Sequence, residues 1–175
     1  MSFLLVALDS LRDFFEAGGN VLYGILFVTT VMWTLIIERI WFFAFDLPRE
    51  IKSTIKTWES RAERKSWRAR RIREAMISRI AAKSDQNIMI IKALMAVLPL
   101  LGLLGTVLGM IEVFDVMAAL GTGNARAMAG GVSKATIPTM CGLVAALSGL
   151  YFAAWLSGKA NETVDRIEGL LRQEN

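Results

Sequence analysis

Residues 99–114 read PLLGLLGTVLGMIEVF, and this stretch decides the fold class. It is apolar enough to lie in lipid, yet it contains Gly102, Gly105, Gly109 and the hydroxyl of Thr106. A simple membrane anchor has no need of that pattern. Membrane helices that pack closely do need small residues at their contacts, and a hydroxyl there can serve a polar partner. The stretch therefore predicts a membrane helix packed against other helices.

Three long runs of the 175-residue chain carry no charge: 21–37, 93–111 and 135–158. A helix needs about 20 residues to cross the hydrocarbon core, so each run is long enough once its apolar flanks are counted. We expect an all-α integral membrane protein with three transmembrane helices that extend into the cytoplasm. The expected segments are an amphipathic helix at 1–18, spans at 19–45, 91–118 and 127–158, a basic helical segment at 46–90, a short outer loop at 119–126 and a C-terminal helix at 159–175.

The positive charge is concentrated between the first two spans. Residues 46–92 contain 13 Lys or Arg and 6 Asp or Glu, a net of +7, whereas residues 1–20 contain one Arg and three acids. Because basic loops stay in the cytoplasm, we expect 46–92 and the C-terminus inside and the N-terminus outside. Helical spacing gives 1–18 a charged and an apolar face, which fits either a helix on the membrane surface or one packed against the protein.

The basic segment is predicted to be helical. Pro48 can occupy the first turn of a helix, and neither Gly nor Pro occurs between Arg49 and Gln86. Ile72, Met76 and Ile80 recur at helical spacing. These signals fit one long helix or a helix pair, and they do not distinguish the two.

The residue types argue against several classes of function. The chain has no histidine, which removes the commonest acid–base group and metal ligand, and it has no phosphate-binding glycine loop. Cys141 is the one cysteine, so no intrachain disulfide can form. We expect no enzymatic activity, no catalytic residue, no cofactor and no metal. Membrane topology accounts for the basic segment, so we also expect no nucleic-acid binding.

Three hydroxyls, on Thr106, Thr136 and Thr139, lie near the middle of the expected membrane. Equal rise along two antiparallel helices brings Thr106 level with Thr139 to within about one turn. A single threonine in a membrane helix usually bonds to its own backbone, whereas two at one level among small residues suggest a polar seam. The expected close-packing positions are Gly102, Gly105, Gly109 and Gly142, although small residues at this spacing are common wherever membrane helices pack.

Two pairs of charged residues flank the spans. Glu112 comes level with Lys134 near the outer side, where they either pair with each other or reach the interface independently. Glu38 and Arg39 lie at the inner end of the first span, where interfacial anchoring is the simpler explanation. No carboxylate lies at the centre of any span. If protons cross this membrane, their central carrier must therefore come from another chain.

The sequences 99–114 and GGVSKATIPTMCGLVAAL at 130–147 together resemble the ExbB/TolQ/MotA proton-channel family, and its ExbB branch in particular. Glu38-Arg39 also fits. The resemblance implies a homopentamer in the inner membrane of Gram-negative bacteria, with the N-terminus in the periplasm and the C-terminus in the cytoplasm. Its implied partners are a single-span ExbD-like protein that carries the proton-binding Asp, a TonB-like protein and membrane lipid. Thr106 and Thr139 match the two pore-facing threonines of the family, and we expect them, together with Thr136, to line the proton path.

The implied function is the channel subunit of a motor that uses the proton motive force to energise TonB-dependent outer-membrane import. Lys134 departs from the pattern, because a Glu is common there, and the cytoplasmic segment is short. The alternatives are a TolQ-like subunit of a Tol-Pal system and a non-conducting oligomeric scaffold. MotA fits poorly because it has a fourth span. A small-solute transporter is disfavoured because this sequence shows none of the inverted repeats expected of one.

Overall fold

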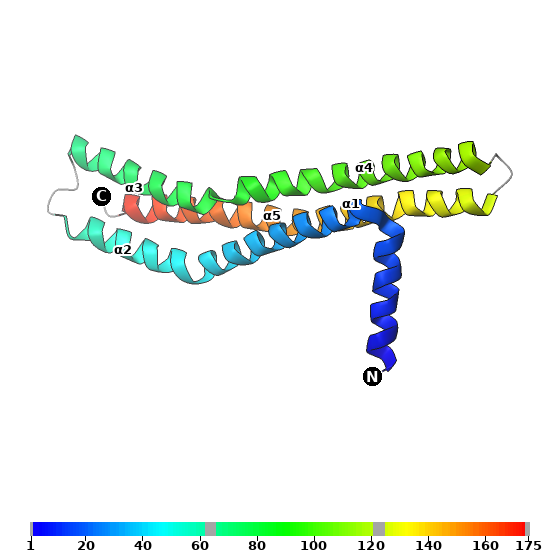
Figure 1. Ribbon diagram of the computed structural model, residues 1–175. Helices are drawn as coiled ribbons and strands as arrows, with labels where there is room; N and C mark the ends of the chain where they lie inside the picture. The colour runs from blue at the N-terminus through cyan, green and yellow to red at the C-terminus, as the bar shows by residue number, and fades with distance from the viewer. Residues whose placement is uncertain (1, 62–65, 121–124, 174–175) are drawn as a thin grey trace. The chain divides into compact units, whose positions relative to one another are not determined.

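The computed structural model describes residues 2–61, 66–120 and 125–173, and every regular element in that part of the chain is a helix (Figure 1). This confirms the predicted all-α class. In chain order the elements are α1 (Ser2–Trp41), the π-helix η1 (Phe42–Asp46), α2 (Leu47–Glu59), α3 (Trp67–Asp85), α4 (Ile88–Leu120) and α5 (Ala125–Gln173).

Three helical stretches are long and apolar enough to cross a membrane, as predicted: Gly18–Glu59, Trp67–Ala119 and Met128–Leu170. Large apolar side chains on all three are exposed, including Phe27 at 69% and Leu147 at 65%. A soluble monomer rarely leaves so much apolar surface in water. The exposed surface is therefore suited to lipid or to other chains, and the protein is of the multi-pass membrane class.

Two of the predicted segments fall partly on residues outside the description. The side chains that would make 1–18 amphipathic, such as Leu4, Leu8 and Asp9, lie outside the described part of the structure. Residues 121–124 of the expected outer loop also lie outside it. The backbone of α1 is interrupted at Gly19, which has φ 67° and ψ −169°. Glycine adopts this conformation without the steric penalty that other residues would meet, so it allows a break in direction at this point.

The helices contribute to two compact units, and the first is built from residues in the ranges 1–33 and 93–150. Parts of α1, α4 and α5 form it. Its buried side chains include Ile25 and Met32 of α1, Leu98 and Val113 of α4, and Ala135 of α5. Most of these are large aliphatic groups, but the contacts between α4 and α5 themselves rest on much smaller residues.

The second unit comprises residues in the ranges 34–92 and 151–175. Its buried cluster joins η1, α2, α3 and α5 and consists of Leu47, Trp58, Ala69, Ile80 and Ile167, with Phe42, Phe43, Ile51, Ile72, Met76 and Ile77 packed against it. The basic segment thus forms a helix pair, one of the two arrangements that its sequence allowed.

Local signals explain where the two helices of this pair begin. Pro48 stands in the first turn of α2, directly after the π-helical turn η1. The Ser66 hydroxyl caps α3 by accepting a hydrogen bond from the Ala69 N–H at 3.3 Å.

Candidate functional site

The α4 and α5 backbones approach each other closely at four glycines, all of which the sequence singled out. A Cβ added at Gly102 would lie 2.9 Å from Thr139 Cα, and one added at Gly109 would lie 2.6 Å from Ala135 Cα. At Gly142 an added Cβ would lie 2.6 Å from the Leu98 carbonyl oxygen, and at Gly105 it would overlap the Pro138 ring. Real Cβ atoms do not approach other atoms so closely, so any side chain at these positions would push the helices apart.

At two further glycines, which were not among the predicted positions, an added Cβ would meet a neighbouring side chain. An added Cβ at Gly131 would overlap the Val113 side chain, and one at Gly149 would lie 2.6 Å from Met32 Sδ. Gly149 therefore lets α1 pack against α5. Gly142 and Gly149 are seven residues apart, which is the helical spacing that could have revealed this second contact.

Thr139 ties the two helices together by a hydrogen bond. Its Oγ1 donates to the backbone carbonyl oxygen of Gly102 across 3.0 Å, and its side chain is half-buried. Because Gly102 has no side chain, its carbonyl is accessible to the neighbouring helix. The bond joins residues that are 37 positions apart in the chain, so it fixes the register of the α4–α5 pair.

The other two threonines bond within their own helices. Thr106 Oγ1 donates to the Leu103 carbonyl at 2.7 Å, and Thr136 Oγ1 donates to the Ser133 carbonyl at 3.0 Å. Gly102, and not Thr106, lies directly opposite Thr139. Thr106 directly follows Gly105 and so lies at the edge of the face by which α4 contacts α5. Equal rise along two helices predicts the level of a residue only to within about one turn, so it could not distinguish Thr106 from Gly102.

Glu112 and Lys134 form an ion pair between α4 and α5. Lys134 Nζ lies 3.2 Å from Glu112 Oε2, and their side chains are 49% and 59% exposed for Lys134 and Glu112 respectively. In water such a pair contributes about 0–1 kcal/mol. In a membrane protein, charged groups near a span usually face a bundle interior, a water-filled path or another chain. The exposed ion pair therefore marks a surface of the α4–α5 helix pair that lipid alone would not cover.

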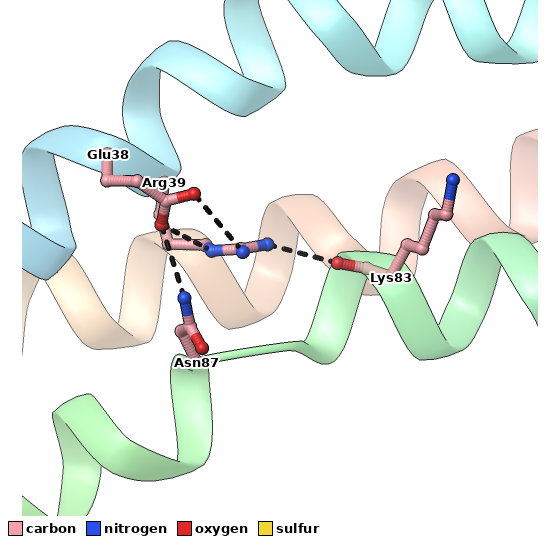
Figure 2. A network of polar contacts seen from close by, with 4 residues as sticks. All are labelled: Glu38, Arg39, Lys83 and Asn87. Carbon is pink, nitrogen blue, oxygen red and sulfur yellow. Dashed lines mark hydrogen bonds and ion pairs between the residues drawn. The ribbon is translucent and has the colours of Figure 1, made fainter.

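Figure 2 shows a polar network around Arg39 in the second unit. Arg39 is 3% exposed, and its Nε and Nη2 donate to the Glu38 carboxylate at 2.9 and 3.3 Å. Its Nη1 donates to the backbone carbonyl of Lys83 at 3.0 Å, and its guanidinium lies 4.9 Å from the centre of the Phe42 ring. Arg39 therefore holds the end of α1 against the last turn of α3.

The remaining members of the network come from α2 and from the link between α3 and α4. Asn87 Nδ2 donates to Glu38 Oε2 at 3.3 Å, and Asn87 itself has φ 65°, a left-handed conformation that Asn tolerates. The Lys83 ammonium points away from Arg39 in Figure 2 and pairs with Glu50 of α2. The sequence drew attention to Glu38 and Arg39 but not to Glu50, Lys83 or Asn87.

Comparison with known proteins indicates the family to which this chain belongs. Residues 47–169 match the model of the MotA/TolQ/ExbB proton channel family. The chain belongs to this family. The matched range contains α2 to α4 and most of α5, with the α4–α5 glycines and all three threonines.

Two curated proteins are similar to the part of this chain that they cover. One is a Synechocystis sp. protein named putative biopolymer transport protein ExbB-like 3, 44% identical over 64 residues, which are 35% of this chain and 30% of that protein. The other is biopolymer transport protein exbB1 of Vibrio cholerae serotype O1, 41% identical over 78 residues, which are 44% of this chain and 34% of that protein. The alignments thus cover roughly a third of either relative.

The family match and the two ExbB-named relatives confirm the resemblance predicted from 99–114 and 130–147. The match begins at residue 47, so Glu38 and Arg39 lie outside it, whereas Glu50, Lys83 and Asn87 lie within it. The described residues contain no group of three or more His, Cys, Asp or Glu that could hold a metal ion.

Proposed function

We propose that this chain is the channel and scaffold subunit of an ExbB–ExbD motor. In this motor the proton motive force energises TonB-dependent import across the outer membrane, without any enzymatic step by the chain itself. The proposal includes a homopentamer in the inner membrane of a Gram-negative bacterium, with the N-terminus in the periplasm and the C-terminus in the cytoplasm. Family membership and the two ExbB-named relatives support it, and the charge of 46–92 supports the orientation.

The α4–α5 pair is the observation that carries the proposal. Its glycine contacts and the Thr139–Gly102 bond make a stiff wall, while the Thr106 side chain remains half-buried and that of Thr136 exposed. Each of these two hydroxyls donates to its own helix and keeps lone pairs to offer outward. A ring of such hydroxyls from several copies would form a weakly polar lining in which another helix can turn.

The proton carrier itself belongs to another chain in this proposal. The uncharged runs 93–111 and 135–158 contain no titratable carboxylate. A channel lined by threonines can solvate or relay a proton but cannot store one, since a hydroxyl has no suitable pKa. A single-span partner with a membrane Asp, of the ExbD kind, would supply the missing group.

Proton flux in reconstituted vesicles tests the proposal. The chain is co-reconstituted with the single-span protein encoded by its neighbouring gene, and acidification of the lumen is followed under an imposed potential. We expect flux only with both proteins present, and its loss when the membrane Asp of the partner is replaced by Asn. Equal flux with that replacement would contradict the proposal.

A non-conducting scaffold is the second candidate, and one observation favours it. The Thr139 hydroxyl is committed to Gly102, which is a structural use of the residue. A stable complex with the single-span partner that conducts no protons would support the scaffold. Restoration of a Tol-Pal phenotype, in place of TonB-dependent uptake, would instead identify the TolQ-like alternative.

A further inference from the structure

A groove of about 300 Å³ lies on the second unit between η1 and α2 on one side and α5 on the other. Its floor is apolar and includes Phe43, Leu47, Ile51 and Ile55, with Leu170 of α5 opposite them. Leu47 is 3% exposed, whereas Leu170 is 39% exposed. Small-molecule pockets begin at about this volume, so the groove has room for part of a flexible apolar ligand.

Three cations line the same groove: Lys52 of α2, and Lys159 and Arg166 of α5. Lys159 pairs with Glu162 at 3.1 Å, but both side chains are well exposed, so this pair is weak and gives little resistance to a competing anion. Among the described residues, neither Lys52 nor Arg166 has an ion-pair partner, and no acid lines the groove. The groove therefore combines an apolar floor with a rim of three cations, of which only Lys159 has an ion-pair partner among the described residues.

The groove begins where two of the apolar runs end. Phe43 lies in η1, close to the inner end of the first predicted span at 19–45, and Lys159 is the first charge after the uncharged run 135–158. Residues at these positions are expected at the level of the lipid headgroups. The basic side chains are thus placed where phosphates of the bilayer are found, and the apolar floor lies beside them.

We propose that this groove binds an anionic phospholipid of the surrounding membrane. Its phosphate is held by Lys52, Lys159 and Arg166, and an acyl chain lies along the part of the floor nearest the membrane, formed by Phe43 and Leu47. Basic pockets between membrane helices on the cytoplasmic side are suited to anionic headgroups. A free phosphate ion would make no use of the apolar floor, and an uncharged lipid would leave the cations without partners. The anionic phospholipid uses both features.

Native mass spectrometry of the full-length chain tests this site. The protein is extracted from nanodiscs that contain phosphatidylcholine with or without phosphatidylglycerol, and the retained lipids are counted. We expect the wild type to retain phosphatidylglycerol selectively. The triple variant K52Q/K159Q/R166Q should lose this selectivity, by about fivefold for each cation removed.

A matched control removes three exposed cations outside the groove, K56Q/R68Q/R70Q, and should keep the wild-type selectivity. If the triple variant does not fold, the single Arg166→Gln change at an exposed position carries the test with a fivefold effect.

Three results would overturn the proposal. The first is equal retention of the two lipids by the wild type. The second is equal loss of selectivity in the groove variant and the matched control. The third is capture of a second copy of the chain, in place of lipid, by a photo-crosslinker at Leu170, because the groove would then be an interface between subunits.

Discussion

Arg39 Nη1 donates a hydrogen bond to the backbone carbonyl of Lys83 across 3.0 Å, and this bond connects the end of α1 to the last turn of α3. The last carbonyls of a helix have no partner within the helix, and a positive charge near them is favourable. Arg39 satisfies one of these carbonyls while its other nitrogens bind Glu38. One buried side chain thus joins two helices and a carboxylate.

Replacing Arg39 with Gln should destabilise the protein by about 1–3 kcal/mol, because the change removes a charged donor from the half-buried Lys83 carbonyl and from Glu38. Arg39→Lys, which keeps the charge but not the planar fork, should give an intermediate loss. Thermal unfolding in detergent, followed by tryptophan fluorescence, measures both. Arg68→Gln removes an equal charge from an exposed position and should leave the midpoint unchanged; a similar loss there would indicate a general charge effect.

Gly109→Ala should destabilise the α4–α5 pair by about 1–3 kcal/mol, since its Cβ would lie 2.6 Å from both Cα and Cβ of Ala135. Gly130→Ala is the matched control, because nothing lies within 4 Å of its added Cβ. That substitution should be neutral or stabilising by about 0.5–1 kcal/mol through helix propensity. Unfolding midpoints of the two variants that coincide would contradict the close packing at Gly109.

Thr139→Val and Thr106→Val should separate a structural hydroxyl from a functional one. Both substitutions keep the side-chain shape. Thr139→Val loses the bond to Gly102 and should cost about 0.6 kcal/mol, up to about 1.7, which is the range for hydrogen bonds between membrane helices. Thr106→Val loses only a bond within its own helix and should leave stability unchanged while lowering proton flux. Stability comes from thermal unfolding and flux from the co-reconstituted vesicles. Full flux in Thr106→Val would remove this residue from the proton path.

Reversing both charges of the Glu112–Lys134 pair should restore what either single reversal removes. Glu112→Lys places two cations side by side, and Lys134→Glu places two carboxylates side by side, so each is expected to impair assembly. The double variant recreates the pair with opposite polarity. Oligomer stability in detergent gives the coupling free energy through a double-mutant cycle. A double variant no better than the worse single one would show that the 3.2 Å contact has no energetic role.

Much of the fold could be predicted, because lipid imposes a simple rule on sequence. The uncharged runs, such as 93–111, can satisfy their backbone groups only as helices, and their glycines at helical spacing indicate the packed face. The division of the basic segment into α2 and α3 was not predictable. No Gly or Pro marks the break after Glu59, so local propensity fits one helix as well as two.

The site was predictable only where the chain is locally regular. The α4–α5 hairpin could be aligned from equal rise, which gave the level of Thr139 and of Glu112 to within a turn but not the bond to Gly102. The network of Arg39 depends on Lys83, which lies 44 residues away, and on the left-handed backbone of Asn87. Neither the long-range contact nor that backbone conformation leaves a periodic signal in the sequence.

The π-helical turn Phe42–Asp46 changes the direction in which all later side chains of the first long helix point. A π turn closes its hydrogen bond one residue later than an α turn, as the Leu47 N–H does on the Phe42 carbonyl. Each later residue is therefore rotated by about 100° from its place on an uninterrupted α-helix. Removing one residue from this turn would hardly alter composition or hydropathy. It would nevertheless rotate Leu47 and Trp58 away from the core and Lys52 away from the groove. The presence of a single extra residue in this turn therefore determines which side of α2 faces the core.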